Sequence, residues 1–506
     1  METKPYEPPE GLPKNRDEFF AKLRTIQQVT AQEGMFSSFD SWCDPDGAFN
    51  PSLFAKDIVD NNNIKTDSES DILYFYDSEH GFYDRNGDAK LRALIDVCLQ
   101  QENRMHRTTE AIYLVHSKTL TTTTPSRKIA FLNGLLDPKT QVLEDFTSNE
   151  FVTVKMSIVY DVNAKCPEIL KFFNEIAPED LQPQFEEIFG YCLLSELPLH
   201  KTTVLLGEGS NGKSTFLDLL TVFLGKENVC HVSLQEMCEG RFERAELQHK
   251  LANLVDDLPG TALKMVGPFK TLTGNAPIMA QRKYGQPFNF WSTAKTLFGC
   301  NKLPKPSEDT IAYYRRFNII PFTRFFIGAT DDKDKLKKMT TPTELSGLLN
   351  LALAGLKRLL ANGDYTNCKS IEENRQFYIK SSDSCKAFAE EQLEASDEPQ
   401  DHVSTETLYQ TYVQYCKHNR LPKIESKPQL TQAVRQTFPN AEQTTARLNL
   451  KIVHVWQYLK LKNVASVADV TGSLLLANFQ NENIGRVEKP VTNVTVATNS
   501  SEEASS

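Results

Sequence analysis

The chain has 506 residues, of which 40% are hydrophobic and 24% are charged, and its net charge is −10. This length is typical of a soluble protein with three or four domains, each built around its own core. The acidic balance excludes a uniformly basic coat for nucleic acid, but it is compatible with a local positive groove.

The ten cysteines are scattered and contain no C-x-x-C pair, so they indicate reduced, buried thiols rather than a zinc ribbon. The N-terminal sequence METKPYEPPEGLPKNRDEFF has no apolar signal core. No apolar run approaches the roughly 20 residues that span a bilayer. We therefore expect a cytoplasmic protein, in a host cell or a prokaryote, with no membrane partner.

The first third of the chain predicts an arm followed by short strands and helices. Residues 1–65 are rich in Pro, Asn and Asp and have weak periodicity, so we expect a variable N-terminal arm there. The next elements follow from apolar spacing. They are strands at 72–76 and 82–83, a helix through 91–99, short strands and turns over 131–160, and helices within 168–197.

A glycine-rich segment follows the apolar run Thr202–Leu206, which predicts a buried parallel strand. The segment matches G-x-x-x-x-G-K-[ST] and opens a helix that begins near Thr215 and stops at Gly225. Its residues are Gly207, Glu208, Gly209, Ser210, Asn211, Gly212, Lys213 and Ser214.

This spacing suits the binding of ATP with Mg²⁺. Glycines let the backbone wrap the phosphates closely, and the N–H groups at the start of a helix attract the anion. Lys213 can reach the β and γ phosphates, and Ser214 can bind magnesium. A chance glycine-rich turn is the alternative, but a full match between a strand and a helix disfavours it.

The apolar run 251–255 ends in Asp256 and Asp257, which supplies the acidic partner that such a loop needs. We predict that Asp256 holds magnesium through water and that Asp257 orients or deprotonates the attacking water. The alternative is a strand that ends in an acidic turn before Pro259.

Three further polar residues fit an ATPase. Asn301 ends the predicted strand 296–300, where an amide can sense the γ-phosphate; otherwise it is a turn residue. Arg315 and Arg316 precede the apolar run 317–320, and Arg suits stabilisation of a phosphoryl transition state from a neighbouring subunit. We favour Arg316 over Arg315 for this role, against the alternative of two surface arginines.

The ordered set of these parts resembles superfamily 3 helicases of the phage, plasmid and poxvirus primase-helicase type. The segments that carry the likeness are 131–137, 189–191, 207–215, 269–274 and 314–317, and the likeness covers roughly residues 70–460. The resemblance implies an AAA+-related core, a hexameric ring with ATP between subunits, and 3′-to-5′ translocation on single-stranded DNA. The family often has Glu as the second acidic residue, whereas this chain has Asp257.

The resemblance also implies a β-hairpin that projects into the pore of the ring, at residues 277–288. Arg282 and Lys283 are expected at its tip with Tyr284 beside them, where cations can track phosphates and an aromatic ring can stack on a base. Lys270 is a weaker candidate for DNA contact. Without a ring, an exposed hairpin with solvated charges is the simpler interpretation.

The predicted fold class is α/β: an AAA+-like P-loop NTPase core with an α+β N-terminal region and a C-terminal winged-helix module. The last has nine basic and four acidic residues in 401–463, which favours DNA contact over a protein-binding wing. The predicted domains are an arm (1–65), a primase-helicase-type collar (66–170), the ATPase core (171–345), a helical region and linker (346–400), the winged-helix module (401–463) and a largely disordered tail (464–506).

The sequence thus predicts an ATP-dependent replicative DNA helicase of a virus, phage or plasmid, acting on single-stranded and forked DNA as a homo-oligomer. The arm is too short for a polymerising primase, so we expect either a primase or polymerase on another chain, or a sequence that is the helicase portion of a longer polyprotein-like product. The alternatives are an origin-binding initiator ATPase, and a nucleic-acid translocase or RNA helicase that does not unwind DNA. A small-molecule kinase is disfavoured because the paired arginines and the basic hairpin would have no role.

Overall fold

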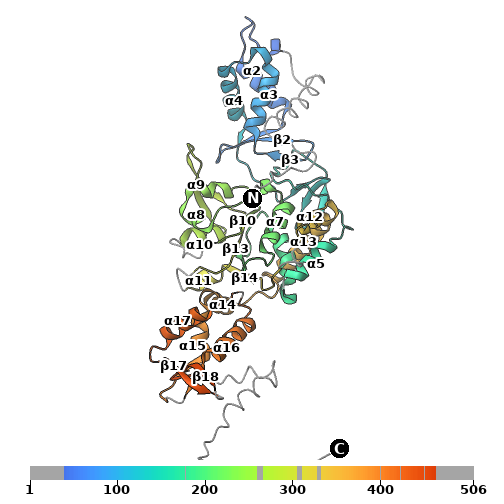
Figure 1. Ribbon diagram of the computed structural model, residues 1–506. Coiled ribbons are helices and arrows are strands. Elements are labelled where there is room, and N and C mark those ends of the chain that lie inside the picture. Colours follow the sequence, from blue (N-terminus) through green and yellow to red (C-terminus); the bar gives the residue numbers. More distant parts are fainter. Residues whose placement is uncertain are drawn as a thin grey trace, which may run out of the picture. The chain divides into compact units, whose positions relative to one another are not determined.

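The computed structural model describes residues 39–176, 178–258, 266–304, 310–326, 332–398, 401–421, 423–448 and 451–462 (Figure 1). The chain divides into two compact units, one formed by Met1–Ala387 with Tyr409–Leu430 and the other by Phe388–Leu408 with Thr431–Ser506. The predicted tail at 464–506 lies outside the described residues. None of the helices in the described ranges is long and apolar enough to cross a membrane.

The first folded part begins earlier than the sequence predicted. A sheet in the order β3-β2-β1-β4 packs with the helices α2, α3 and α4, which Figure 1 shows beside β2 and β3. The strands are β1 Ile64–Asp67, β2 Leu73–Asp77, β3 Phe82–Asp84 and β4 Leu120–Thr121, and the helices are α2 Pro51–Asn61, α3 Gly87–Leu99 and α4 Met105–Thr119.

Our prediction of an arm over 1–65 was therefore wrong for its second half. Helix α2 contributes the buried side chains Phe54 and Ile58 to the core of this part, and Trp42 stacks edge-on against Phe54. Asn50 caps the helix by accepting from two backbone N–H groups. A short helix with only a few apolar residues leaves a weak periodic signal, so its sequence resembled a loop.

A second small sheet and two helices lead to the central domain. The strands β5 Ile129–Phe131, β6 Gly134–Asp137 and β7 Val142–Glu144 form an antiparallel meander, and α5 Pro167–Ile176 and α6 Gln182–Cys192 follow. Helix α13, Pro342–Asn362, packs against α6. Gly190 makes the close approach possible, because a side chain there would collide with the Ala352 carbonyl.

The central sheet has five parallel strands in the order β14-β8-β13-β10-β9. They are β8 Thr202–Leu206, β9 Val229–Cys230, β10 Ala252–Val255, β13 Lys295–Cys300 and β14 Phe317–Pro321. The predicted strands at 202–206, 251–255 and 296–300 are thus confirmed. Because all strands run the same way, the residues after β8, β10 and β13 meet at one edge of the sheet.

Shorter elements surround this sheet. They are α7 Lys213–Leu224, α8 Leu234–Glu239, α9 Arg241–Arg244, α10 Gly267–Thr273, the hairpin β11 Pro277–Gln281 and β12 Pro287–Trp291, α11 Ile311–Tyr314, α12 Lys335–Met339 and α14 Ile371–Ser382. The described 3-10 turns are η1 Phe39–Trp42 before α2, η2 Gln100–Glu102 between α3 and α4, η3 Glu179–Leu181 between α5 and α6, η4 Lys226–Asn228 between α7 and β9, and η5 Ala245–Leu247 between α9 and β10. The core under α7 is rich in aromatic rings, with Phe216 against Phe185 and Phe189.

The second unit holds two sheets, β16-β18-β17 and β15-β19. Their bounds are β15 Leu393–Ala395, β16 His402–Ser404, β17 Glu442–Leu448, β18 Lys451–Gln457 and β19 Leu459–Leu461. Three helices, α15 Ser384–Gln392, α16 Thr405–His418 and α17 Lys427–Thr437, are shared between the two units.

Two expected boundaries therefore change. The end of the expected helical region and linker, 346–400, contains α15 and β15. Residues 409–430 of the expected 401–463 module pack with the first unit, where the Tyr412 hydroxyl contacts Ser384 at 2.7 Å and accepts from the Glu425 backbone N–H at 3.0 Å. These contacts join segments far apart in the chain, so composition alone did not reveal them.

Candidate nucleotide-binding site

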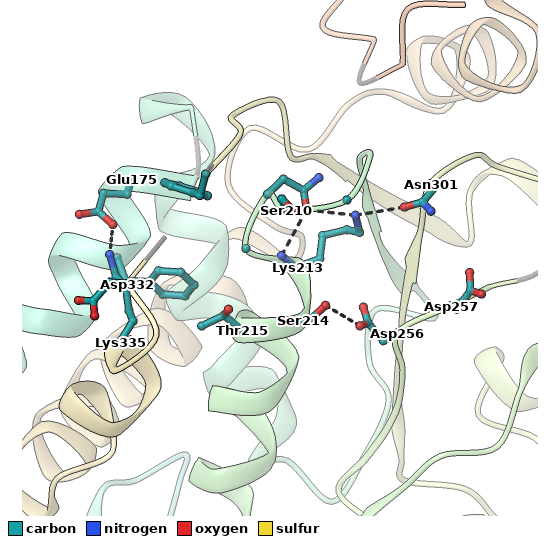
Figure 2. A pocket seen from close by; sticks show the side chains of 15 residues that line it. Glu175, Ser210, Lys213, Ser214, Thr215, Asp256, Asp257, Asn301, Asp332 and Lys335 are labelled. Atoms are coloured by element: carbon teal, nitrogen blue, oxygen red, sulfur yellow. Dashed lines mark hydrogen bonds and ion pairs between the residues drawn. The ribbon is translucent and has the colours of Figure 1, made fainter. Parts of the chain in front are cut away.

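A cavity of about 350 Å³ lies over the loop between β8 and α7, a volume typical of small-molecule sites. Figure 2 shows Ser214, Asp256, Asp257 and Asn301 on one side of Lys213, and Glu175, Asp332 and Lys335 on the other. The lining residues are Phe172, Glu175, Gly209, Ser210, Asn211, Gly212, Lys213, Ser214, Thr215, Asp256, Asp257, Asn301, Phe326, Asp332 and Lys335.

The loop backbone is held by contacts that only small residues allow. A Cβ at Gly207 would lie 2.5 Å from the Phe322 carbonyl oxygen, and Gly212 has a φ of 90°, which favours glycine. The Asn211 amide donates to the Phe322 carbonyl at 3.2 Å. The N-cap residue Gly212 offers no side chain, and the Lys213 N–H makes only a long hydrogen bond to Asn211 Oδ1, at 3.5 Å, so the N–H groups at the start of α7 can bind an anion.

Lys213 lies at the start of α7 and is only 5% exposed. Its ammonium donates to the Gly207 carbonyl, to Asn211 Oδ1 at 3.1 Å and to Asn301 Oδ1 at 3.5 Å. Burial lowers the pKa of Lys213, while Asp256 opposes that shift. A buried ammonium surrounded by oxygen acceptors is well placed to exchange some of them for phosphate oxygens.

Ser214 and Asp256 form the part of the site that suits a magnesium ion. The Ser214 hydroxyl donates to Asp256 Oδ2 at 2.6 Å, and both side chains are exposed to the cavity. Magnesium typically takes one or two protein oxygens and completes its shell with water and phosphate oxygens, so this donor pair fits it. Within the described ranges, no cluster of three or more His, Cys, Asp or Glu forms a stronger metal site.

Asp257 and Asn301 complete the same edge of the sheet, after β10 and β13. Gly299 permits this arrangement, because a Cβ there would lie 2.6 Å from the Asp256 carbonyl oxygen. The five polar residues predicted from separate segments are thus brought together. Such an edge can bind phosphates, hold a divalent cation and orient a water molecule.

The far end of the cavity has residues that the sequence did not single out. Lys335 pairs with Glu175 and lies 5.5 Å from the centre of the Phe172 ring, and Phe326 is anchored by a backbone hydrogen bond to Ser210 at 2.7 Å. These residues come from α5, α12 and the segment after β14. Only tertiary packing joins them, and no local motif marks them.

Two family models match the chain, "D5 N terminal like" at residues 55–178 and a family of unknown function (DUF5906) at 205–316. A "Putative helicase L207/L206" of Acanthamoeba polyphaga mimivirus is 24% identical over 338 residues, which is 62% of this chain and 35% of that protein. A "Putative helicase 184R" of Invertebrate iridescent virus 6 is 26% identical over 228 residues, 40% of this chain and 23% of that protein. These matches show that the chain is similar to viral proteins named as putative helicases and carries a D5_N-like segment.

The matched region spans about a third of the first relative's length and about a quarter of the second's. A solved structure of the NrS-1 C-terminal region is also similar, with 10% identity, a TM-score of 0.40, and coverage of 81% of this chain and all of that one. Likeness at this level is too weak to assign a fold or a function.

The two arginines that follow α11 have different surroundings. Arg316 is 7% exposed, and its guanidinium donates to Thr273 Oγ1 at 3.0 Å, to the Lys270 carbonyl at 3.3 Å and to the Ala312 carbonyl. In this structure the Arg316 donors are used within its own chain, whereas the Arg315 side chain is exposed; our preference for Arg316 as a residue that reaches a neighbouring subunit stays a prediction.

The hairpin β11–β12 also differs from expectation at Arg282. Its guanidinium donates to Gln248 Oε1 at 2.6 Å and to the Ser70 carbonyl at 3.3 Å, and it lies 4.9 Å from the centre of the Phe288 ring. Arg282 is therefore at the base of the turn, not at a free tip. The exposed turn consists of Lys283, Tyr284 and Gly285, and Tyr284 is 106% exposed with a φ of 66°.

Lys270 lies on α10 and is half-buried. Its carbonyl accepts from Arg316, so its backbone belongs to the packing between α10 and the strand β14. Its assignment to DNA contact stays a prediction, as do those of Lys283 and Tyr284.

Proposed function

We propose that the chain is the motor of a superfamily 3 DNA helicase, an ATPase that translocates on single-stranded DNA as a hexameric ring. One observation carries this proposal: Lys213, the Ser214–Asp256 pair, Asp257 and Asn301 face a single cavity at the carboxyl edge of a parallel sheet. The viral relatives named as helicases support the choice of substrate.

Each residue of the site has a separate role in ATP hydrolysis. The N–H groups of Gly209–Thr215 and the Lys213 ammonium bind the β and γ phosphates. Ser214 and Asp256 hold Mg²⁺, which when bound neutralises charge on the phosphate oxygens. Asp257 accepts a proton from, or orients, the attacking water, and the Asn301 amide contacts the γ-phosphate and so distinguishes ATP from ADP.

The ring completes the site in this proposal. Arg315 is exposed and always charged, so in a homohexamer it reaches the ATP of the neighbouring subunit and stabilises the transition state. Lys283 and Tyr284 at the hairpin turn contact DNA in the pore, the first through phosphate and the second by stacking. Movement is expected to run 3′ to 5′.

The remaining parts fit accessory roles. Strands β16–β18 with α16 and α17 form a winged-helix-like module that binds DNA, and the core is AAA+-like. A primase or polymerase acts from a separate chain, in the cytoplasm of the host. Forked DNA is the natural substrate of such an assembly.

An unwinding assay tests this function. The full chain is given ATP, Mg²⁺ and partial duplexes whose single-stranded tail is on either the 3′ or the 5′ side, with Lys213→Ala as control. We expect strand separation only with the 3′ tail and only in the active protein. ATP-dependent movement along a single strand without separation would instead favour a translocase.

A further inference from the structure

A second cavity, of about 200 Å³, lies beside the strand β2 and the turn that leads into α3. Its lining includes Tyr74, Arg85, Lys155 and His249, with Asp84 and Glu227. None of its lining residues belongs to the nucleotide-binding cavity, so the two are separate sites.

Two polar atoms in this lining are buried without a hydrogen-bond partner in the described part of the chain. They are the hydroxyl of Tyr74, a residue that is 0% exposed, and Nε2 of His249. Buried polar groups in folded proteins are nearly always hydrogen-bonded, and each exception calls for an explanation. A ligand that offers hydrogen-bond acceptors is one such explanation.

Positive charge gathers around the same cavity. Among the described residues, no carboxylate forms an ion pair with Arg85 or Lys155, and the Lys155 ammonium lies 5.5 Å from the centre of the Phe82 ring. Burial lowers the pKa of Lys155. Burial also lowers the pKa of Lys250, and the charge of Arg85 adds to that shift. Like charges held close together favour an anion between them.

The charges of Asp77, Glu227 and Glu79 oppose the lowering of the Lys155 pKa, but neither acidic residue of the lining forms an ion pair with Arg85 or Lys155 in the described part of the chain. Asp84 accepts from the backbone N–H and the side-chain amide of Asn86, at 2.9 and 3.0 Å, and pairs with Lys90 at 3.0 Å. Glu227 is exposed, where solvent screens its charge. The carboxylates therefore leave Arg85 and Lys155 available.

The start of α3 adds to this positive field. Asn86 precedes the 13-residue helix but makes no side-chain cap bond, because its amide donates to Asp84. The Asn86 carbonyl accepts from the Ala89 and Lys90 N–H groups, both at 3.1 Å, whereas the N–H groups of the first two helical residues have no acceptor from the Asn86 side chain. Their dipoles favour an anion at this end of the helix.

We propose that this cavity binds a phosphate group, with Arg85 and Lys155 supplying charge and the Tyr74 hydroxyl donating a hydrogen bond. The phosphate comes either from a nucleic-acid backbone or from a free phosphate compound, since both present the same oxygen acceptors. Direct nucleotide hydrolysis is not involved, so the proposal stands apart from the function of the first cavity.

The test uses the full chain with Lys213→Ala, which weakens phosphate binding at the loop. Inorganic phosphate is titrated by calorimetry, and a fluorescein-labelled oligo(dT) is titrated by anisotropy at several salt concentrations. Arg85→Gln is compared with Arg92→Gln, a matched change at an exposed position of α3 that does not line the cavity.

We expect Arg85→Gln to weaken at least one probe about tenfold, as for the loss of a charged hydrogen bond, while Arg92→Gln changes neither. A loss confined to oligo(dT), with a salt slope reduced by about 0.7, assigns the site to a single-stranded backbone. A loss confined to inorganic phosphate assigns it to a free phosphate compound. Equal affinities of the two variants for both probes would overturn the proposal.

Tyr74→Phe gives a second and independent measurement. Because the hydroxyl has no partner among the described residues, its removal should leave the melting temperature of the free protein unchanged or raise it, while the affinity for the same probe falls. A lower melting temperature with unchanged affinity would show that the hydroxyl serves the fold and not a ligand.

Discussion

Functional roles were predicted from sequence for the glycine-rich loop and for the basic residues Arg282 and Arg316, but their surroundings in the structure differ. The loop lies between β8 and α7 as its pattern requires, and Lys213 faces the cavity. Arg282 and Arg316 instead donate to acceptors of their own chain. The glycine-rich motif determines the local backbone conformation, so its geometry can be predicted from sequence. The exposure of a long cationic side chain instead depends on residues that are distant in the sequence.

The largest expected effect comes from the loop. Lys213→Ala removes the ammonium that binds the phosphates, so ATP turnover should fall at least about 10³-fold. The fold should persist, because α7 is held to the core by apolar side chains such as Phe216 and Leu220. Steady-state phosphate release measures the turnover, and circular dichroism measures whether the fold persists. Turnover at the level of the unchanged protein would show that this loop is not the site.

Arg315→Ala tests the role proposed for the exposed arginine. If Arg315 acts on the neighbouring subunit, turnover should fall about 10³-fold while nucleotide affinity stays nearly unchanged. Mixing Arg315→Ala with Lys213→Ala subunits should restore part of the activity, because a mixed ring contains interfaces with one intact copy of each residue. Absence of any rescue would argue against action between subunits.

Arg316→Ala should act mainly on stability. Its loss leaves the Thr273 hydroxyl and two carbonyls without a charged donor, which costs about 1.5–3 kcal/mol of unfolding free energy. Urea denaturation of Arg316→Ala and Arg315→Ala side by side measures the difference. Should Arg315→Ala prove the more destabilising of the two, the assignment of roles is reversed.

The smallest effect is expected at the hairpin turn. Tyr284→Ala should weaken binding of single-stranded DNA about tenfold, as for the loss of one stacked base, and leave stability unchanged because the ring is fully exposed. Anisotropy with labelled oligo(dT) measures the affinity, with Tyr113→Ala as a control at another exposed tyrosine. Equal affinity in both variants would exclude stacking by Tyr284.

Much of the fold was accessible from sequence because its signals are local. The strands β8, β10 and β13 are short apolar runs, and α13 shows helical spacing. The fold of residues 39–65 and the packing of 409–430 with the first unit were missed, since both depend on contacts between distant segments. The same reason hid Phe172, Glu175 and Lys335 at the far end of the nucleotide cavity.

The central claim is that hydrolysis at the loop is coupled to DNA. Steady-state ATPase activity of the full chain, with and without single-stranded DNA, with RNA as control and with salt varied, tests it most directly. We predict that single-stranded DNA strongly stimulates the ATPase activity and that this stimulation weakens as the salt concentration rises, because salt screens the phosphate contacts. Turnover that is indifferent to nucleic acid at every salt concentration would contradict it.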